Sequence, residues 1–397
     1  MTSVAAQTLA AIEESASSQQ RRIRVLTLTP FYPSSLDPAQ GLFVSDPLPL
    51  LKDFSVSNTT IAVEPFYRVR SRPSEAQPAD WIRYFSLPGN LGLATAGEFL
   101  AGRLLKQVFG ASPSFDLIHA HAALPCGHAA SILSKRLSIP FVVTVHGLDA
   151  FFTQQAGKIV GSWCQQVAQD VYRSAQIVVC ISGTVRERVL SRSEVNTAVI
   201  YNGVDSERFA PADQPTSPLV VLSVGNLIAI KGHRSLLCAF SQISKEFPGC
   251  LLEIVGDGPE RGRLKELAAD LNIANGVRFY GRQSRDFVAD AMTRCSVFAL
   301  PSEYEGLGCV YLEAMSCAKP AIGCYGQGIE EVIEHGITGM LVPPNNINEL
   351  AESIRILLSN KDLRARIGAA ARTGILRRFT LQHQASELAR LYRGCLP

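Results

Sequence analysis

The 397-residue sequence contains no long apolar run, and no stretch approaches the about 18 consecutive apolar residues that a membrane-spanning helix needs. Its ten cysteines include no C-x-x-C pair, which argues against a disulfide framework or a zinc site and favours reduced thiols in a cytosolic protein. The formal charge of +3 is too small to indicate nucleic acid as a partner. Residues 1–20 lack a basic start followed by an apolar core, so we expect a flexible tail rather than a signal peptide.

Short apolar strands alternate with helical stretches along the chain, which is the pattern of parallel α/β sheets. A length of 397 residues with 47% hydrophobic content predicts two domains. The expected strands are Arg24–Thr29, Thr60–Glu64, Asp116–Ala120, Phe141–Val145, Ile177–Ile181, Ala198–Tyr201, Val220–Val224, Leu251–Val255, Val277–Tyr280, Val297–Leu300, Ala321–Gly323 and Met340–Val342. Between the two series, the prolines and polar residues of Val204–Leu219 indicate a linker.

This pattern predicts two doubly wound, Rossmann-like units that face each other across a cleft. We expect an N-terminal domain at 21–204, a linker at 205–219 and a second domain at 220–378. Residues 379–397 are expected to form a helix that packs back on the first domain.

Residues 301–320 hold the most informative pattern, PSEYEGLGCVYLEAMSCAKP. An apolar strand precedes it and a helical stretch ends it, so Glu305, Gly306 and Gly308 lie where a strand gives way to a helix. Ligands of open α/β sheets bind at this edge, and a helix start offers N–H groups to a phosphate that glycines allow to come close. Glu313 follows Glu305 by eight positions, which suits one acid at the helix mouth and one two turns deeper. The competing interpretation makes Glu305 an ordinary helix-start acid and Glu313 a solvated surface residue.

Histidines follow two of the strands in the first half of the sequence. His146 comes directly before a glycine at a carboxyl edge, where a functional role is favoured over a structural one. Asp149 is close enough in sequence to orient this histidine or to contact an acceptor. His119 and His121 end another strand, and we expect one to pack in the core and one to line the cleft. Gly41 lies in a long loop rich in proline and serine, where plain turn chemistry is the alternative.

Five segments together resemble glycosyltransferase family 4, the retaining group with the two-domain GT-B fold. They are VTVHGLDAF (143–151), IYNGVDSERF (200–209), SVGNLIAIKGH (223–233), IVGDGPERGRL (254–264) and the 301–320 block. The resemblance covers nearly the whole chain after the tail and implies a nucleotide-sugar donor held mostly by the second domain.

In similar enzymes the donor diphosphate rests at the helix start that corresponds to Gly306–Cys309. The resemblance implies that Lys231 neutralises the charge building on the leaving diphosphate, so neither a metal ion nor a cofactor is expected. Glu313 matches the acceptor of hydrogen bonds from the ribose hydroxyls, and Glu305 matches the residue that holds the donor sugar. With His146 near that sugar, His146, Lys231 and Glu305 are the expected catalytic residues. The expected donor-binding residues are Gly41, Asn226, Lys231, Gly256, Gly281, Arg282, Glu305, Gly306, Leu307, Gly308, Cys309 and Glu313, and those on the acceptor side are His121 and Asp149.

Two places depart from the family pattern. Related enzymes usually carry an arginine five positions before the lysine, where this sequence has Asn226, and an amide grips phosphate less strongly than a guanidinium does. Arg234, Arg261 and Arg263 are candidates for replacing that charge. Residues 325–332, YGQGIEEV, lack the adjacent glycines of many relatives, which leaves the identity of the donor sugar open.

The sequence thus predicts a retaining transfer of a hexose-type sugar from a UDP- or GDP-sugar to an acceptor hydroxyl, in cell-surface glycan, glycolipid or polysaccharide synthesis. The acceptor is a saccharide, a lipid-linked saccharide or a small metabolite. A sugar-nucleotide epimerase and a non-catalytic nucleotide-sugar-binding protein are the alternatives. Because Glu305 is assigned to sugar hydroxyls, no obvious nucleophile is left, and front-face substitution fits better than double displacement.

Residues Phe99–Phe109 have apolar positions at helical spacing, with Arg103 and Lys106 toward another face. Such a helix either lies on an anionic membrane or packs in the core of the first domain. The expected location is therefore cytoplasmic, with peripheral contact to the inner face of the plasma membrane as an option.

Overall fold

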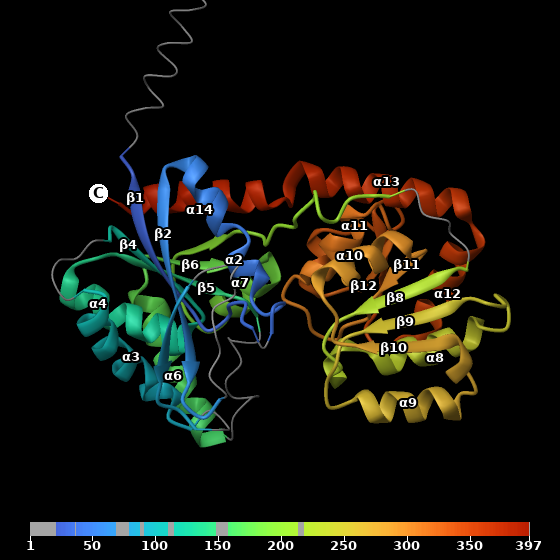
Figure 1. The fold of residues 1–397 in the computed structure, drawn as a ribbon, viewed down its shortest axis with the longest axis horizontal. Coiled ribbons are helices and arrows are strands. Elements are labelled where there is room, and N and C mark those ends of the chain that lie inside the picture. The colour runs from blue at the N-terminus through green and yellow to red at the C-terminus, as the bar shows by residue number, and fades with distance from the viewer. Residues whose placement is uncertain are drawn as a thin grey trace, which may run out of the picture.

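The computed structural model describes residues 21–35, 37–68, 79–87, 91–109, 115–147, 158–212 and 218–396. It shows two parallel α/β domains, which confirms the predicted fold class (Figure 1). The tail at 1–20 lies outside the described residues.

The N-terminal domain is built on a seven-stranded parallel sheet in the order β3-β2-β1-β4-β5-β6-β7. Its strands are β1 (Ile23–Thr29), β2 (Val56–Pro65), β3 (Asp80–Tyr84), β4 (Leu117–His121), β5 (Phe141–Val145), β6 (Ile177–Cys180) and β7 (Thr197–Val199). The sequence pattern did not indicate β3, because this edge strand buries only Ile82 and Tyr84 of its five residues.

Alternate side chains of this sheet enter two different cores. Leu26 and Val143 belong to the face covered by α3 (Leu93–Gln107), α4 (His128–Leu137) and α6 (Lys158–Ser174). Val25 and Val142 belong to the opposite face, where the C-terminal helix α14 (Leu381–Gly394) packs beside the short helix η1 (Leu48–Phe54). Leu100 and Leu104 of α3 are buried while Phe99 is exposed, so the core alternative describes most of the apolar face of this helix.

The C-terminal domain has a six-stranded parallel sheet in the order β10-β9-β8-β11-β12-β13. Its strands are β8 (Val220–Val224), β9 (Leu251–Val255), β10 (Val277–Gly281), β11 (Val297–Ala299), β12 (Ala321–Cys324) and β13 (Gly339–Val342). Its helices are α8 (His233–Ile243), α9 (Arg261–Asp270), α10 (Arg285–Arg294), α11 (Cys309–Ser316), α12 (Ile347–Ser359) and α13 (Lys361–Arg378). In both sheets the strand order reverses beside the first strand of the domain, β1 or β8, and ligands of such folds bind at the carboxyl end of this point.

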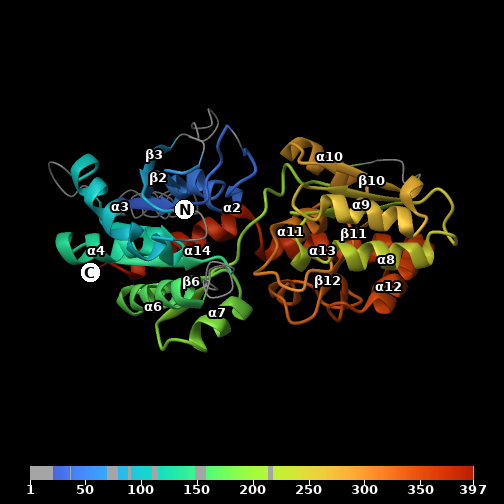
Figure 2. The same cartoon turned by 90° about the horizontal axis from the view of Figure 1, so that it is seen from below.

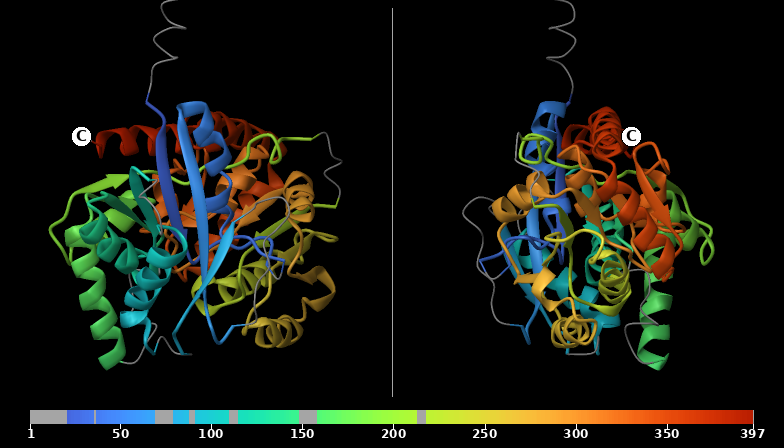
Figure 3. Two further views of the ribbon diagram at one scale, coloured as in Figure 1. Left: turned by 60° about the vertical axis from the view of Figure 1, so that its left-hand side comes forward. Right: turned by 90° about the vertical axis from the view of Figure 1, so that its right-hand side faces the viewer.

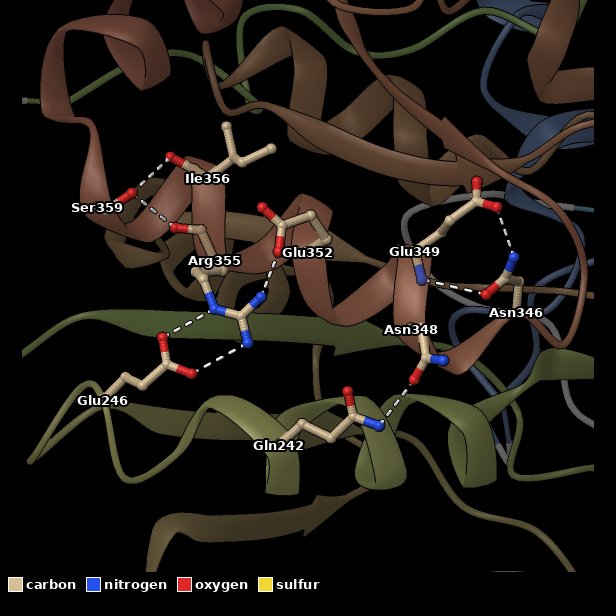
Figure 4. A network of polar contacts seen from close by, with 9 residues as sticks. All are labelled: Gln242, Glu246, Asn346, Asn348, Glu349, Glu352, Arg355, Ile356 and Ser359. Atoms are coloured by element: carbon tan, nitrogen blue, oxygen red, sulfur yellow. Dashed lines mark hydrogen bonds and ion pairs between the residues drawn. The ribbon is translucent and has the colours of Figure 1, made fainter.

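A polar network on the outer surface holds α12 against α8 (Figure 4). Arg355 donates to the Glu246 carboxylate from Nε at 2.8 Å and from Nη2 at 3.0 Å, and Gln242 donates to Asn348 at 3.1 Å. This network fixes the helix whose first residue is His233, two positions after Lys231.

The polypeptide passes between the domains twice, and the two crossings lie side by side. Val204 N donates to Phe379 O at 2.9 Å, and Leu381 N donates to Val204 O at 3.1 Å. Beyond the second crossing α14 continues along the N-terminal domain, so α13 and α14 form one ridge over both domains (Figures 1 and 2). The left view of Figure 3 shows the red C-terminal helices along the top of the molecule.

Candidate active site

Backbone groups of the loop before α11 form hydrogen bonds that hold it to the turn after β12. Glu305 N donates to the Gln327 side chain at 3.0 Å, and Gly328 N donates to Glu305 O at 3.0 Å. Gly308 caps the helix with a φ of 82°, which is accessible to glycine at little cost. At the start of α11 Tyr311 N donates to Gly308 O at 3.0 Å, and the amides before it precede the first turn of the helix, so this loop offers N–H groups to an anion. Leu307 takes part only through its backbone, because its side chain is fully buried in the core.

Lys231 and Glu305 form an ion pair across the carboxyl edge of the sheet. Lys231 ends the short 3-10 turn η5 (Ala229–Lys231), and its side chain is 18% exposed, against 13% for Glu305. The two loops are also joined by their backbones, because Glu303 N donates to Ile230 O at 2.8 Å. An ammonium and a carboxylate with so little solvent around them interact more strongly than a surface pair.

Glu313 lies one turn inside α11, not two turns from Glu305, because the chain is a loop as far as Gly308. Burial raises the pKa of the Glu313 carboxyl to about 7; Arg285 acts against this rise and Asp46 adds to it. The side chain is only partly exposed, so Glu313 is not a solvated surface residue.

Removing the ionisable group at Glu313 should stabilise the ligand-free protein in alkaline but not in acidic solution. Between pH 4.5 and about 7 the folded state keeps the proton that the unfolded chain has released, so this group's contribution to stability falls as the pH rises. Urea unfolding should therefore favour Glu313→Gln over wild type by about 1–3 kcal/mol more at pH 8 than at pH 5. A difference between the two proteins that is the same at both pH values would contradict the buried carboxyl.

Three histidines of the N-terminal domain stand in a row at the ends of β4 and β5. His146 Nε2 lies 2.9 Å from His121 Nδ1, and the His121 ring lies 4.3 Å from that of His119 between centroids. His119 is in turn bonded to Tyr392 and Thr144, each at 2.7 Å, so it is the member of the pair that packs in the core. Burial lowers the pKa of His119 and of His146 to about 3 and holds the pKa of His121 well below its usual range.

Because these histidines are neutral when folded, the protein should lose stability in acid. Below about pH 6.5 the unfolded chain takes up protons that the folded state refuses, so stability falls as the pH drops toward 3. Between pH 6.5 and 5 the His119 ring alone should cost about 2 kcal/mol, and His119→Gln should remove that share of the loss. An acid slope of the unfolding free energy that is the same in His119→Gln as in the wild type would contradict this share.

The two domains meet at the loops that carry these groups. A side chain on Gly306 would place its Cβ 2.8 Å from His146 O, and one on Gly147 would place it 3.4 Å from the Gly306 Cα and 2.7 Å from the Tyr304 hydroxyl. Glycine on both sides therefore lets the backbone after His146 touch the backbone after Glu305. The structure brings together His121, His146, Gly306 and the Lys231–Glu305 pair at one interface.

The other predicted residues surround this point at strand ends. Gly256 N donates to Gly281 O at 2.8 Å, which joins the ends of β9 and β10, while Asn226 is exposed after β8. Arg282 pairs with Asp37 of the opposite domain, and Gly41 begins the short helix α2 (Leu42–Ser45) of that domain. Asp149 lies outside the described residues.

The structure also places Cys309 and the three arginines that were candidates for replacing the missing charge. The Cys309 sulfur accepts a bond from Asn202 Nδ2 at 3.6 Å, and burial raises the pKa of the thiol to about 12. Arg261 is paired with Asp257 of the loop before α9 at 3.0 Å, and Arg263 pairs with Glu260 and is 79% exposed. Arg234 is exposed on α8.

Sequence reasoning assigned no role to several residues of the interface, although Gln327 and Glu331 lie in the 325–332 segment that it singled out. Ser182, Gln327 and Glu331 contact the loop or the opposite domain, and Arg285 pairs with Asp46 at 2.7 Å between domains. The only signals for them were a serine at a strand-to-helix junction and two acids after a Gly-x-Gly turn, and neither identifies a partner so distant in sequence.

Within the described part of the chain, no group of three or more His, Cys, Asp or Glu side chains is arranged to hold a metal ion. A search of the same residues for a helix with the length and apolar character to span a bilayer finds none.

Two family models match consecutive parts of the chain, Glycosyltransferase Family 4 over residues 13–208 and Glycosyl transferases group 1 over residues 205–374. An uncharacterized glycosyltransferase of Methanocaldococcus jannaschii is 32% identical over 258 residues, which cover 65% of this chain and 69% of that protein. Sucrose-phosphate synthase of Thermosynechococcus elongatus superposes with a TM-score of 0.79 at 21% identity, covering 94% of this chain and 99% of the other. Anabaena HepE in complex with UDP-glucose superposes with a TM-score of 0.74 at 22% identity, covering 94% and 100%. The chain therefore belongs to glycosyltransferase family 4 and is a glycosyltransferase with the GT-B fold.

Proposed function

We propose that the protein transfers a hexose-type sugar from a UDP- or GDP-sugar to an acceptor hydroxyl with retention of the anomeric configuration. The observation that supports this most directly is the Lys231–Glu305 pair, which stands beside the amides of the Gly306–Cys309 loop and opposite His146. A cation and helix-start amides suit a diphosphate, and a carboxylate suits sugar hydroxyls.

In the proposed reaction the bond between the anomeric carbon and the diphosphate oxygen breaks, and the acceptor oxygen forms its bond on the same face. The leaving phosphate oxygen takes the electron pair and accepts the proton of the acceptor hydroxyl. Lys231 and the loop amides stabilise the charge on the diphosphate, and Glu305 holds the sugar and steadies positive charge on the anomeric carbon. His146 orients the sugar from the N-terminal domain. This scheme needs no metal ion, so transfer should continue in excess EDTA.

The donor and the product distinguish this proposal from its alternatives. A thermal-shift panel of UDP-, GDP- and ADP-sugars should show selective stabilisation by one of them, because a ligand that binds only the folded form raises its stability. The complex of HepE with UDP-glucose makes UDP-sugars the first members of the panel. Proton NMR of the product should then show the same anomeric configuration as in the donor, as judged from the coupling constant of the anomeric proton. Isomerisation of the free sugar nucleotide without an acceptor would indicate an epimerase instead.

For the location we propose the cytoplasm, with an acceptor that is a saccharide, a lipid-linked saccharide or a small metabolite. Exposed apolar side chains at the ends of β2 and β3, Phe66, Phe85 and Leu87, support contact with a membrane, and exposed Arg68 lies beside them. Flotation with vesicles that contain anionic lipid tests this contact. Protein that stays at the bottom of the gradient would restrict the acceptor to water-soluble compounds.

A further inference from the structure

The start of helix α7 (Gly183–Leu190) in the N-terminal domain is bound by a carboxylate of the C-terminal domain. Glu331 accepts hydrogen bonds from Gly183 N at 2.7 Å, from Thr184 N at 2.7 Å and from the Thr184 hydroxyl at 3.0 Å. The Tyr201 hydroxyl donates to the same carboxylate at 2.8 Å. An anion at a helix N-terminus with four donors is held firmly. Although burial acts to raise it, the pKa of Glu331 lies below its ordinary value because of these donors.

The same helix start also contacts the loop that carries the catalytic carboxylate. Ser182, the N-cap of α7, donates its hydroxyl to Gly306 O at 2.6 Å and accepts from Val185 N at 3.2 Å. One helix terminus of the N-terminal domain thus binds two separate segments of the C-terminal domain, the Gly306 loop and the turn η7 (Gly328–Glu331). In Figures 1 and 2, α7 lies at the side of its domain that faces the C-terminal domain.

Hydrogen bonds of the Glu305 backbone connect those two segments to each other. The side chain of Gln327 accepts from Glu305 N, and Gly328 N donates to Glu305 O. The bonds therefore form a closed ring that runs from α7 through Glu331 to the η7 turn, on to Glu305 and Gly306, and back to Ser182. Each contact to α7 crosses between the domains, so opening of the cleft would break the ring on two sides and leave the Glu305 loop held only by contacts within the C-terminal domain.

We propose that Ser182 and Glu331 are positioning residues that couple closure of the two domains to the placement of Glu305 and Gly306. This role rests on the proposed transfer reaction. Neither residue touches the donor; each acts on it through the loop that α7 and η7 hold between them. A hinge rotation of the domains would break the hydrogen bonds of Ser182 and Glu331 across the interface completely. The loop should therefore have two states, one held by α7 and one released from it.

The test uses the full-length variants Glu331→Gln, Ser182→Ala and the double variant, with exposed Glu334→Gln as the matched control. Release of free nucleotide from UDP-glucose, UDP-N-acetylglucosamine and GDP-mannose measures turnover without an acceptor. We expect the turnover number of Glu331→Gln to fall about 10- to 100-fold, while the dissociation constant of UDP or GDP changes less than about three-fold. The double variant should lose little more than the worse single variant, because the ring couples the loop to domain closure only while both of its contacts with α7 are made.

Amide hydrogen exchange and small-angle scattering supply two measurements that would not change if Glu331 only stabilised the fold. In Glu331→Gln the amides of Gly183 and Thr184 should exchange faster with nucleotide bound, while those of α13 keep wild-type rates. The radius of gyration with saturating nucleotide should exceed that of the wild type. Wild-type turnover in Glu331→Gln, or losses of the two single variants that multiply fully in the double, would overturn the coupling. A wild-type enzyme that releases no nucleotide from any of the donors would instead count against the proposed function, and the exchange experiment would still decide whether Glu331 binds α7.

Discussion

Alanine at position 231 should lower the turnover number about 100- to 1,000-fold, equivalent to about 3–4 kcal/mol of activation free energy. The ammonium of Lys231 is the cation that the structure holds against the Glu305 loop, and its field is needed most when the diphosphate leaves. The loss should therefore appear in the turnover number at saturating donor more than in the Michaelis constant. Burst and steady-state measurements of nucleotide release would check this.

The control for this prediction is Lys265→Ala on α9. Lys265 is exposed, so its removal changes the net charge equally without touching the site. A second measurement concerns stability, because Lys231→Ala leaves the mostly buried Glu305 carboxylate without its ion-pair partner. Turnover within a few-fold of the wild type in Lys231→Ala would remove the lysine from the reaction.

Glutamine at position 305 should separate nucleotide binding from sugar transfer. In the structure the Glu305 carboxylate is paired with the Lys231 ammonium, so a diphosphate has to compete for that cation. Glu305→Gln frees the ammonium, and the affinity for UDP or GDP should stay equal or rise. Transfer should fall about 10- to 100-fold, because a charge-assisted hydrogen bond to the sugar is lost. Calorimetry with the nucleotide and turnover with the sugar nucleotide measure the two effects.

Glu303→Gln is the matched control, since Glu303 is exposed two positions away in the same loop. Both quantities should stay at wild-type values in that variant. A loss of nucleotide affinity in Glu305→Gln that parallels the loss of transfer would place Glu305 on the nucleotide and not on the sugar.

Local sequence pattern was enough to predict most of the framework. Buried parallel strands are continuous apolar runs, so β5, β8 and β9 lie at the residues where the sequence indicated them. The edge strand β3 was not predicted, because only one of its faces is buried and its sequence is not a continuous apolar run. The helix start at Gly308 could be predicted from its glycines, but the depth of Glu313 was misjudged because spacing alone does not say where the loop ends.

The sequence by itself determined the two sheets, the loops at their carboxyl edges and the family, because each depends on hydrophobic period, turn residues and motifs within short segments. The tertiary structure alone decided which groups meet. The pairing of Lys231 with Glu305, of His121 with His146, and of Glu331 with the start of α7 joins residues up to 148 positions apart. Such contacts are set by how the two domains pack against each other, and no local pattern records the distance between two separate strand ends.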